Sequence, residues 1–350
     1  MNSLIYFNNI KKKIKSISYL LNFFLKKKEL IRNLRKNFFN LSIETVNTCN
    51  ADCIFCAYQY QTREKGIMDF DMYKEIIRDF VKTGGGDMSL TPTVGEVFVD
   101  KLIIERIKFA RSFKEIKSIG FHSNMISLGI HNINDLVHSG ITTITLSTSG
   151  FDEDMYKRVY RSIQYKRMYR NFIKLLELNR ENGEPIDIRV EMRSDKPLKE
   201  TTNFPDYLNL LRYLPEEKIK MSTRYDNWFG KIKQKDLTGT MKLRSGFDLM
   251  IPSRLRISPC SEFYSGPIVY WNGDVGICGC RDVDAKELII GNVKKNKLTD
   301  IWYNKKHIQI MDNFFKETPK ICLDCNHYNN ASTFFEKESL NKINNYTNIY

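Results

Sequence analysis

The sequence contains no long apolar run and no dense cysteine framework. None of its apolar stretches approaches the length of about 20 residues that a helix needs to cross a bilayer. Its start lacks the basic, apolar and small-residue order of a secretory signal peptide. A long stretch without cysteine separates Cys56 from Cys260, unlike the short, cysteine-dense domains that disulfides hold together. We therefore expect a soluble, cytoplasmic protein.

Three of the eight cysteines form a C-x3-C-x2-C triplet, Cys49, Cys53 and Cys56, directly after a strand-like apolar run at 41–46. Three thiolates on one tight loop can hold three irons of a [4Fe–4S] cube and leave the fourth iron without a protein ligand. An open coordination position serves chemistry rather than structure. A zinc knuckle or three buried thiols is the alternative, but structural zinc usually takes four ligands and no fourth lies nearby in the sequence.

The other five cysteines lie near the end of the chain, at Cys260, Cys278, Cys280, Cys322 and Cys325. Clustered C-x-C and C-x2-C spacings in a long chain indicate metal binding in a reducing compartment. The surrounding sequence adds Gly-Asp before Cys278, then Gly-Asn at 291–292 and Ile-Trp at 301–302.

Together the two cysteine groups resemble the radical SAM superfamily, with a C-terminal SPASM or twitch auxiliary-cluster domain. The aromatic Phe55 before the last cysteine of the triplet fits the family, and the resemblance covers about residues 40–330. It implies that S-adenosylmethionine binds the open iron and is cleaved to a 5′-deoxyadenosyl radical. It also implies an electron donor of flavodoxin or ferredoxin type.

The resemblance implies auxiliary clusters, and full SPASM domains carry enough cysteines for two. The five cysteines here support one four-cysteine [4Fe–4S] cluster in addition to the radical-generating cluster. The ligands that we assign to it are Cys260, Cys278, Cys322 and Cys325. Cys280 then stays free, although residues two apart on a strand share a face, so Cys280 can replace Cys278. A zinc ion at this second site is the alternative.

Short apolar runs alternate with longer amphipathic ones between residues 41 and 226. We expect strands at 41–46, 87–91, 117–123, 141–148, 186–193 and 218–225. We expect helices near 71–82, 100–113, 131–138, 153–160, 166–182 and 204–213. Six βα units indicate parallel strands with right-handed crossovers.

The resemblance narrows this α/β fold to a partial (β/α)6 TIM-like barrel, followed by a small α+β SPASM/twitch domain, with chemistry at the carboxyl ends of the strands. A chain of this length can hold such a core and an appendage. The units that we predict are a basic helical arm at 1–38, the barrel at 39–230, the cluster domain at 231–335 and a polar tail at 336–350.

Three segments after the predicted strands resemble cofactor-binding motifs of the family. Gly95-Glu96 resembles the Gly-Gly-Glu segment, whose carboxylate and backbone receive the ammonium group of S-adenosylmethionine. Ser123 and Asn124 follow the third strand as candidate ribose or substrate contacts. Ser147 follows the fourth strand as a candidate on the cofactor side.

The fifth and sixth strands carry charged residues on one face. Alternation places Arg189, Glu191 and Arg193 together, and the next strand repeats the pattern with Arg224 and Asp226. In a barrel covered by helices this face lines the lumen. The guanidinium groups then form internal ion pairs, or they bind an anionic group of cofactor or substrate. We assign Arg189 and Glu191 to the cofactor, and the other three residues to the substrate.

The positive charge of the chain, +14 in total, is concentrated at its start, where residues 1–40 hold ten lysines and arginines against Glu29 alone. Apolar residues recur among them at helical spacing. This arm either rests on an anionic membrane surface or packs its apolar stripe on the barrel. No nucleic-acid motif accompanies the charge, so we do not expect nucleic acid as a partner.

The function that we predict is hydrogen abstraction from a small polar or anionic substrate, of sugar or aminocyclitol type, followed by oxidation with the auxiliary cluster as electron acceptor. Epimerisation, with Cys280 as the catalytic hydrogen donor, is an alternative. Modification of a ribosomal peptide and a non-catalytic electron-transfer role are two others.

Overall fold

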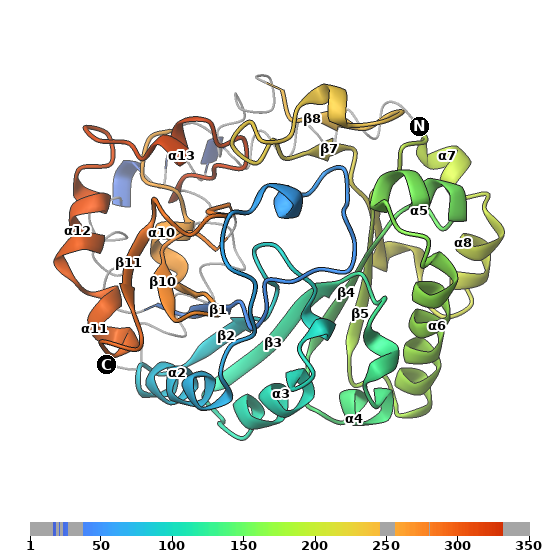
Figure 1. Cartoon of the computed structure of the whole chain (residues 1–350), viewed down its shortest axis with the longest axis horizontal. Helices are drawn as coiled ribbons and strands as arrows, with labels where there is room; N and C mark the ends of the chain where they lie inside the picture. The colour runs from blue at the N-terminus through green and yellow to red at the C-terminus, as the bar shows by residue number, and fades with distance from the viewer. Residues whose placement is uncertain are drawn as a thin grey trace.

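The computed structural model describes residues 17–18, 21, 24–26, 38–245, 256–279 and 281–331. Its strands form one nine-stranded sheet in the order β11-β10-β9-β1-β2-β3-β4-β5-β6, and β7 and β8 form a separate pair. Figure 1 shows the sheet curving around the centre of the molecule with helices on its outside. This arrangement confirms the predicted partial barrel with a C-terminal domain.

Six strands, paired in parallel throughout, make up the barrel. They are β1 (Asn40–Ile43), β2 (Gly86–Ser89), β3 (Ile116–Ser123), β4 (Thr143–Thr148), β5 (Asp187–Met192) and β6 (Ile219–Met221). The helices between and after them are α2 (Phe70–Lys82), α3 (Ile103–Arg111), α4 (Ile133–Val137), α5 (Glu153–Tyr160), α6 (Tyr165–Glu181), α7 (Leu198–Thr201) and α8 (Pro205–Leu210). Short 3₁₀ helices add η1 (Ala57–Tyr60), η2 (Val97–Val99), η3 (Leu128–Ile130) and η4 (Glu216–Lys218).

The sixth strand is shorter than the sequence predicts. It ends at Met221, and the chain turns away from the barrel before β7 (Arg224–Tyr225), which pairs with β8 (Lys242–Leu243). The predicted strand at 218–225 is therefore wrong in its second half, and its alternating faces do not extend beyond Ser222.

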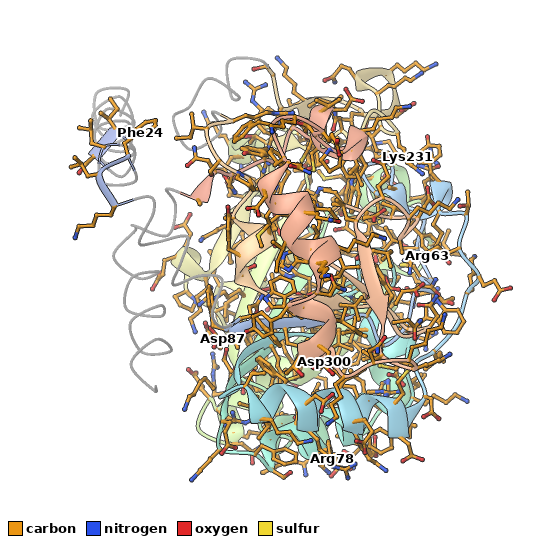
Figure 2. The ribbon with its side chains drawn as sticks, turned by 90° about the vertical axis from the view of Figure 1, so that its left-hand side faces the viewer. Phe24, Arg63, Arg78, Asp87, Lys231 and Asp300 are labelled. Atoms are coloured by element: carbon orange, nitrogen blue, oxygen red, sulfur yellow. The ribbon has the colours of Figure 1, made fainter. Side chains whose placement is uncertain are left out.

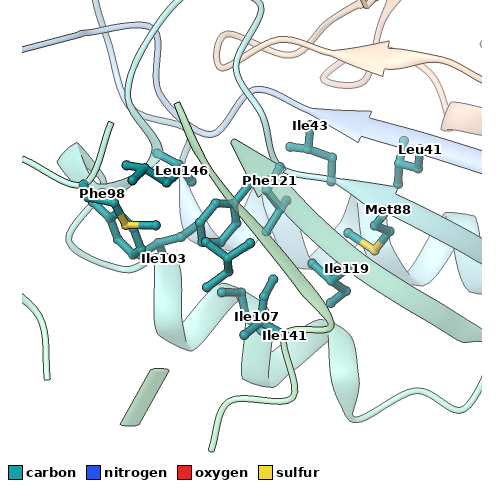
Figure 3. Packing of buried hydrophobic residues seen from close by; sticks show 14 of the residues in the cluster. Leu41, Ile43, Met88, Phe98, Ile103, Ile107, Ile119, Phe121, Ile141 and Leu146 are labelled. Atoms are coloured by element: carbon teal, nitrogen blue, oxygen red, sulfur yellow. The ribbon is translucent and has the colours of Figure 1, made fainter. Parts of the chain in front are cut away.

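Apolar side chains of the strands and the helices form the core. In α2, buried residues recur at helical spacing, and the Asp69 side chain caps the helix by accepting a hydrogen bond from the Met72 N–H. Figure 3 shows side chains of the strands, among them Ile119 and Phe121, packed against Ile103 and Ile107 of α3. Burial on this side leaves the opposite faces of the strands free to line the lumen.

The C-terminal domain extends the sheet of the barrel. Its elements are α10 (Glu262–Ser265), β9 (Ile268–Val269), β10 (Asp274–Gly276), β11 (Ile289–Asn292), α11 (Leu298–Trp302), α12 (Lys305–Asp312) and α13 (Lys320–Leu323). β9 pairs in parallel with β1, with Ser42 opposite Ile268, and β10 continues antiparallel to β9. The approach is so close that a Cβ on Gly266, which has a φ of +155°, would collide with the carbonyl of Asn40.

A buried ion pair fastens this junction. The Arg63 guanidinium donates to both carboxylate oxygens of Glu44, at 2.6 and 2.9 Å, and its Nε donates to the carbonyl of Val283 at 2.7 Å. The two side chains are 8% and 0% exposed. Arg63 therefore joins the end of β1 to the C-terminal domain. Figure 2 labels its position.

Most of the predicted N-terminal arm at 1–38 lies outside the described residues. Of those that are described, Leu21 and Leu25 are 60% and 83% exposed, and Phe24, labelled in Figure 2, is 57% exposed. Both interpretations of the arm therefore stay predictions. The polar tail at 336–350 also lies outside the described residues. Of the helices that the structure describes, none is both long enough and apolar enough to span a bilayer.

The Glu44–Arg63 pair gives a test of the junction. Arg63→Met should lower the free energy of unfolding by about 3–5 kcal/mol, because it leaves a buried carboxylate without its partner. Chemical denaturation would measure this. The matched control is Arg78→Met, which breaks an exposed pair with Glu75 and should cost less than about 1 kcal/mol. Equal small effects of both changes would contradict the assigned role.

Candidate active site

The cysteine triplet lies on the loop between β1 and η1, at the carboxyl end of the first barrel strand. The end of α5 holds this loop by backbone hydrogen bonds: Asp52 N–H donates to the carbonyl of Tyr160 at 3.3 Å, and Ile54 N–H to that of Val159 at 3.0 Å. The Phe55 ring packs edge-on against Tyr160, with centroids 5.4 Å apart. Contacts from a distant helix therefore fix a loop that has no regular structure of its own.

All three thiols of the triplet are free and partly buried. Burial raises the pKa of Cys53 and of Cys56, and the Arg193 guanidinium acts in the opposite direction on both. In the described residues, no three Cys, His, Asp or Glu side chains converge closely enough to hold one metal ion. A single zinc ion needs thiolates at about 2.3 Å from one centre, whereas a cube binds each thiolate to its own iron.

Glu96 joins the loops after β2 and β3. Its buried carboxylate accepts hydrogen bonds from Ser123 Oγ at 2.6 Å, from Asn124 N–H at 2.8 Å and from Phe98 N–H at 3.2 Å. Burial raises the pKa of Glu96 to about 7, against the effect of these donors. The structure thus gives this side chain three protein partners, and its predicted contact with the ammonium group of the cofactor stays a prediction.

Asn124 reaches the cysteine loop directly. Its Nδ2 lies 3.8 Å from Cys49 Sγ and donates to Asn50 Oδ1 at 2.8 Å. Ser123, by contrast, is buried and its hydroxyl is bonded to Glu96. Gly95 allows the segment after β2 to pass close to the backbone after β1. A Cβ at this position, which has a φ of +151°, would lie 2.8 Å from the carbonyl oxygen of Val46.

Three buried hydroxyl groups in or after β4 have no hydrogen-bond partner among the described residues, namely those of Thr148, Ser149 and Tyr156. Burial raises the pKa of Tyr156, and Cys53, Glu96 and Cys49 raise it further, which places its hydroxyl close to the cysteine loop. Unpaired buried hydroxyls are costly and mark places where a ligand supplies the partner. These unpaired hydroxyl groups fit a cofactor rich in hydrogen-bonding groups.

Arg193 and Ser147 belong to one network at the carboxyl ends of β4 and β5. Arg193 donates to Ser147 Oγ at 2.8 Å and to Glu191 Oε2 at 3.0 Å. Ser147 also shares a hydrogen bond of 2.8 Å with the Tyr160 hydroxyl. The Arg193 guanidinium lies 5.1 Å from the centre of the Phe55 ring. The ion-pair interpretation therefore holds for Arg193, which also touches the cysteine loop.

The lumen is a cavity of about 850 Å³ lined by charged and hydroxyl side chains. Arg189, Lys218 and Lys220 contribute positive charge, and Asp187, Glu191 and Glu217 contribute negative charge. The prediction that the charged face of β5 lines the lumen is confirmed. Three cations and three carboxylates line this cavity, so their formal charges balance. Arg189 pairs with Asp187 and is not brought to the triplet.

From the sequence, a hydrogen bond within the barrel is favoured for His122 over a role as a base. His122 lines the same cavity, and its Nε2 lies 3.8 Å from Glu191 Oε2. Burial lowers the pKa of His122, so its imidazole is neutral at pH 7. Its position in the His-Ser-Asn segment at the end of β3 was the available signal.

Arg224 and Asp226 do not lie in the lumen, because β6 ends before them. Arg224 is exposed in β7. Asp226 accepts a hydrogen bond of 2.7 Å from Arg281 Nε, at the junction with the C-terminal domain. Their predicted place on the lumen face is wrong, and Asp226 instead has a partner beside the second cysteine group.

Three cysteines of the second group lie together. Burial raises the pKa of Cys260 to about 12, with a contribution from Cys325, and both cysteines contribute to raising the pKa of Cys322. Burial raises the pKa of Tyr270, and Asp282, Glu44 and Cys278 raise it further. Cys280 lies outside the described residues, so the choice between these two ligands stays open.

The segment 226–228 connects the two cysteine groups. On one side, Asn227 N–H donates to Asn326 Oδ1 at 3.2 Å, next to Cys325. On the other side, Trp228 Nε1 donates to the carbonyl of Phe55 at 3.0 Å, next to Cys56. The Arg281 guanidinium covers the Trp228 ring at 4.5 Å.

Comparison with known families agrees with this geometry. Residues 43–190 match the Radical SAM superfamily, and residues 260–326 match the SPASM iron-sulfur cluster-binding domain. The chain is a radical SAM enzyme with a C-terminal SPASM domain. Its cofactors are S-adenosylmethionine and [4Fe–4S] clusters, which the triplet, the second cysteine group and the unpaired hydroxyls at β4 fit.

Three solved structures share the fold of this radical SAM enzyme at low identity. BtrN in complex with AdoMet and 2-DOIA is 16% identical, with a TM-score of 0.54 over 83% of this chain and 94% of that chain. Streptococcus suis SuiB bound to precursor peptide SuiA is 17% identical, with a TM-score of 0.56 over 85% and 73%. Native anSMEcpe with bound AdoMet and Cp18Cys peptide is 11% identical, with a TM-score of 0.51 over 89% and 96%. No curated protein matches the chain by sequence.

The ligand assignment of the triplet can be tested directly. Replacing Cys49, Cys53 and Cys56 with Ala should abolish reductive cleavage of S-adenosylmethionine and lower the iron content by about four per chain, the content of one cube. Iron analysis and 5′-deoxyadenosine release under anaerobic conditions measure both effects. Replacing Cys260, Cys322 and Cys325 instead should remove the other cluster. Unchanged cleavage in the first variant would overturn the assignment.

Proposed function

We propose that this enzyme abstracts a hydrogen atom from a carbon of a small, hydroxyl-bearing substrate of sugar or aminocyclitol type and oxidises it to a carbonyl compound. The observation that carries the proposal is the lining of the lumen. Seven serine and threonine residues line this cavity, namely Ser89, Thr91, Ser118, Thr142, Thr143, Thr145 and Ser222. Such a surface offers hydrogen bonds to several hydroxyl groups of one small molecule.

One cation of the lumen suits an anionic or strongly polar group on the substrate. Lys220 lines the cavity, and no carboxylate of the described residues lies within 4.0 Å of it, whereas Arg189 and Lys218 share Asp187. Arg193 is held beside the cysteine loop by Glu191 and Ser147, where it supports the geometry of the site.

Oxidation of an alcohol removes one hydrogen atom from carbon, one proton from the hydroxyl group and one electron. When bound, the cofactors would supply the 5′-deoxyadenosyl radical that takes the hydrogen atom, and the auxiliary cluster would accept the electron. His122 is the proposed acceptor of the proton, since it is neutral at pH 7 and faces the lumen beside Glu191. The carbon–oxygen double bond forms as the proton and the electron leave.

The junction supports oxidation because it brings the second cysteine group to the triplet through Asn227 and Trp228. A peptide substrate is the second candidate. It is favoured by the fold that this chain shares with SuiB and anSMEcpe, whose solved structures contain peptides.

The proposed function is tested by anaerobic incubation of the reconstituted enzyme with S-adenosylmethionine, dithionite and separate pools of monosaccharides, aminocyclitols and peptides. We expect a ketone, and 5′-deoxyadenosine above the amount released without substrate, only with a polyhydroxy compound. In deuterated water, the product should carry no deuterium at the reacting carbon.

The other outcomes identify the alternatives. Deuterium at the reacting carbon, lost in Cys280→Ala while 5′-deoxyadenosine persists, would show epimerisation with Cys280 as hydrogen donor. Activity restricted to the peptide pool would overturn the proposed substrate class.

The role of His122 predicts a pH dependence. Product formation should be constant above pH 6.5 and fall at lower pH, because burial lowers the imidazole pKa below this value and protonation then removes the base. His122→Asn should lower ketone formation by about 100-fold or more, without this pH dependence, and still release 5′-deoxyadenosine. The matched control for the pH profile is Ser118→Ala in the same cavity, which should keep the pH dependence of the parent enzyme. An unchanged pH profile in His122→Asn would contradict the role.

A further inference from the structure

A second cavity, of about 630 Å³, lies on the outer face of the barrel between α6 and the segment that joins η3 to α4. Figure 1 shows α6 and α4 on the outside of the sheet, beyond β4 and β5. Its lining residues are Gly129, His131, Asn132, Ile133, Arg167, Arg170, Asn171 and Lys174. None of them lines the lumen, so a molecule bound here would not compete with the substrate.

The cavity carries a concentration of unneutralised positive charge. Arg167, Arg170 and Lys174 are spaced three and four residues apart, so they share one face of α6. Among the residues that the structure describes, no carboxylate lies within 4.0 Å of any of the three, whereas Lys166 of the same helix pairs with Glu153 at 3.3 Å. Like charges at this spacing repel, so the arrangement is unfavourable without an anionic partner.

The floor of the cavity leads to the radical-generating cluster site. Asn171 lines the cavity, and its Nδ2 donates to the carbonyls of Met125 at 2.9 Å and Ile126 at 3.2 Å. These residues follow Asn124, whose side chain lies 3.8 Å from Cys49 Sγ. One buried asparagine and one loop therefore separate this basic surface from a ligand of the cluster.

The rim of the cavity is fixed to the same part of the site. His131 Nε2 is hydrogen-bonded to the carbonyl of Phe98 at 2.9 Å, within the segment that Glu96 caps. Next to it, Ile130 is 53% exposed. A preformed basic surface with an exposed apolar side chain has the character of a protein–protein contact.

We propose that this cavity is the docking site of an acidic one-electron carrier protein, of flavodoxin or ferredoxin type, which reduces the radical-generating cluster. The proposal rests on the radical SAM chemistry of the chain and goes beyond its substrate. The carrier loses one electron and the cluster gains it, without proton transfer. Positive charge on this surface, which Asn171 and the 124–126 loop connect to Cys49, steers the acidic carrier toward the cluster site.

The test compares two reductants on the holoenzyme with S-adenosylmethionine and no substrate: a photoreduced flavodoxin and dithionite. The variant Arg167→Glu/Arg170→Glu should lower the second-order rate of 5′-deoxyadenosine release with flavodoxin at least tenfold. With dithionite, a small reductant that needs no docking, the rate should stay within twofold of the parent enzyme. The matched control, Lys305→Glu/Lys306→Glu on α12, makes the same charge change far along the chain and should leave both rates within twofold.

Binding gives a readout that does not depend on turnover. Calorimetric titration with oxidised flavodoxin should show an affinity that falls with salt in the parent enzyme and is at least tenfold weaker in the double variant. If this variant does not fold, Arg167→Gln/Arg170→Gln removes the same charges and should show a smaller loss in the same direction.

Three outcomes would overturn the proposal. Equal losses with flavodoxin and dithionite would show that the arginines support the cluster site rather than docking. An unchanged flavodoxin rate would place docking elsewhere. Binding of RNA or of anionic lipid vesicles that depends on these arginines, with the flavodoxin rate retained, would assign the surface to that partner. Because the assay omits substrate, a wrong substrate class would leave all these results unchanged.

Discussion

The backbone hydrogen bonds between β1 and β9 are the constraint on which the rest of the site depends. Glu44 N–H donates to the carbonyl of Val269 at 2.9 Å, and Ser42 N–H to that of Pro267 at 3.0 Å. These hydrogen bonds join the strands of the barrel and of the C-terminal domain into one sheet. The loop after β1 must therefore lie beside the loops of the second cysteine group. Two sites that are far apart along the chain become neighbours for this reason.

The segment 226–228 and Arg63 fix how the two cysteine groups lie relative to each other. Arg63 neutralises the buried Glu44 at the end of β1 and bonds to Val283 of the C-terminal domain. Asn227 and Trp228 bond to residues next to Cys325 and Cys56. Charged and indole hydrogen bonds are directional, so they fix the separation of the two cysteine groups more firmly than apolar packing does. Such a fixed separation is what transfer of an electron between two clusters requires.

Much of the fold follows from local patterns. Apolar periodicity and the six repeated βα units predict the barrel, and the carboxyl ends of its strands carry the residues around the triplet. Alternation along β5 correctly predicts that Arg189 and Glu191 face the lumen. The same argument fails for Arg224, because alternation assumes that the strand continues, and where β6 ends depends on the pairing of β7 with β8.

The sequence by itself determined the chemistry of the cysteine triplet, since three thiols within eight residues of one loop are neighbours in any fold. Only the tertiary structure decided the partners of the charged residues. Asp226 meets Arg281, Glu96 meets Ser123 and Asn124, and Arg167, Arg170 and Lys174 meet no carboxylate among the described residues. The physical reason is that a charged side chain takes whichever partner the packing of distant segments brings within hydrogen-bond distance, and sequence spacing carries no record of that meeting.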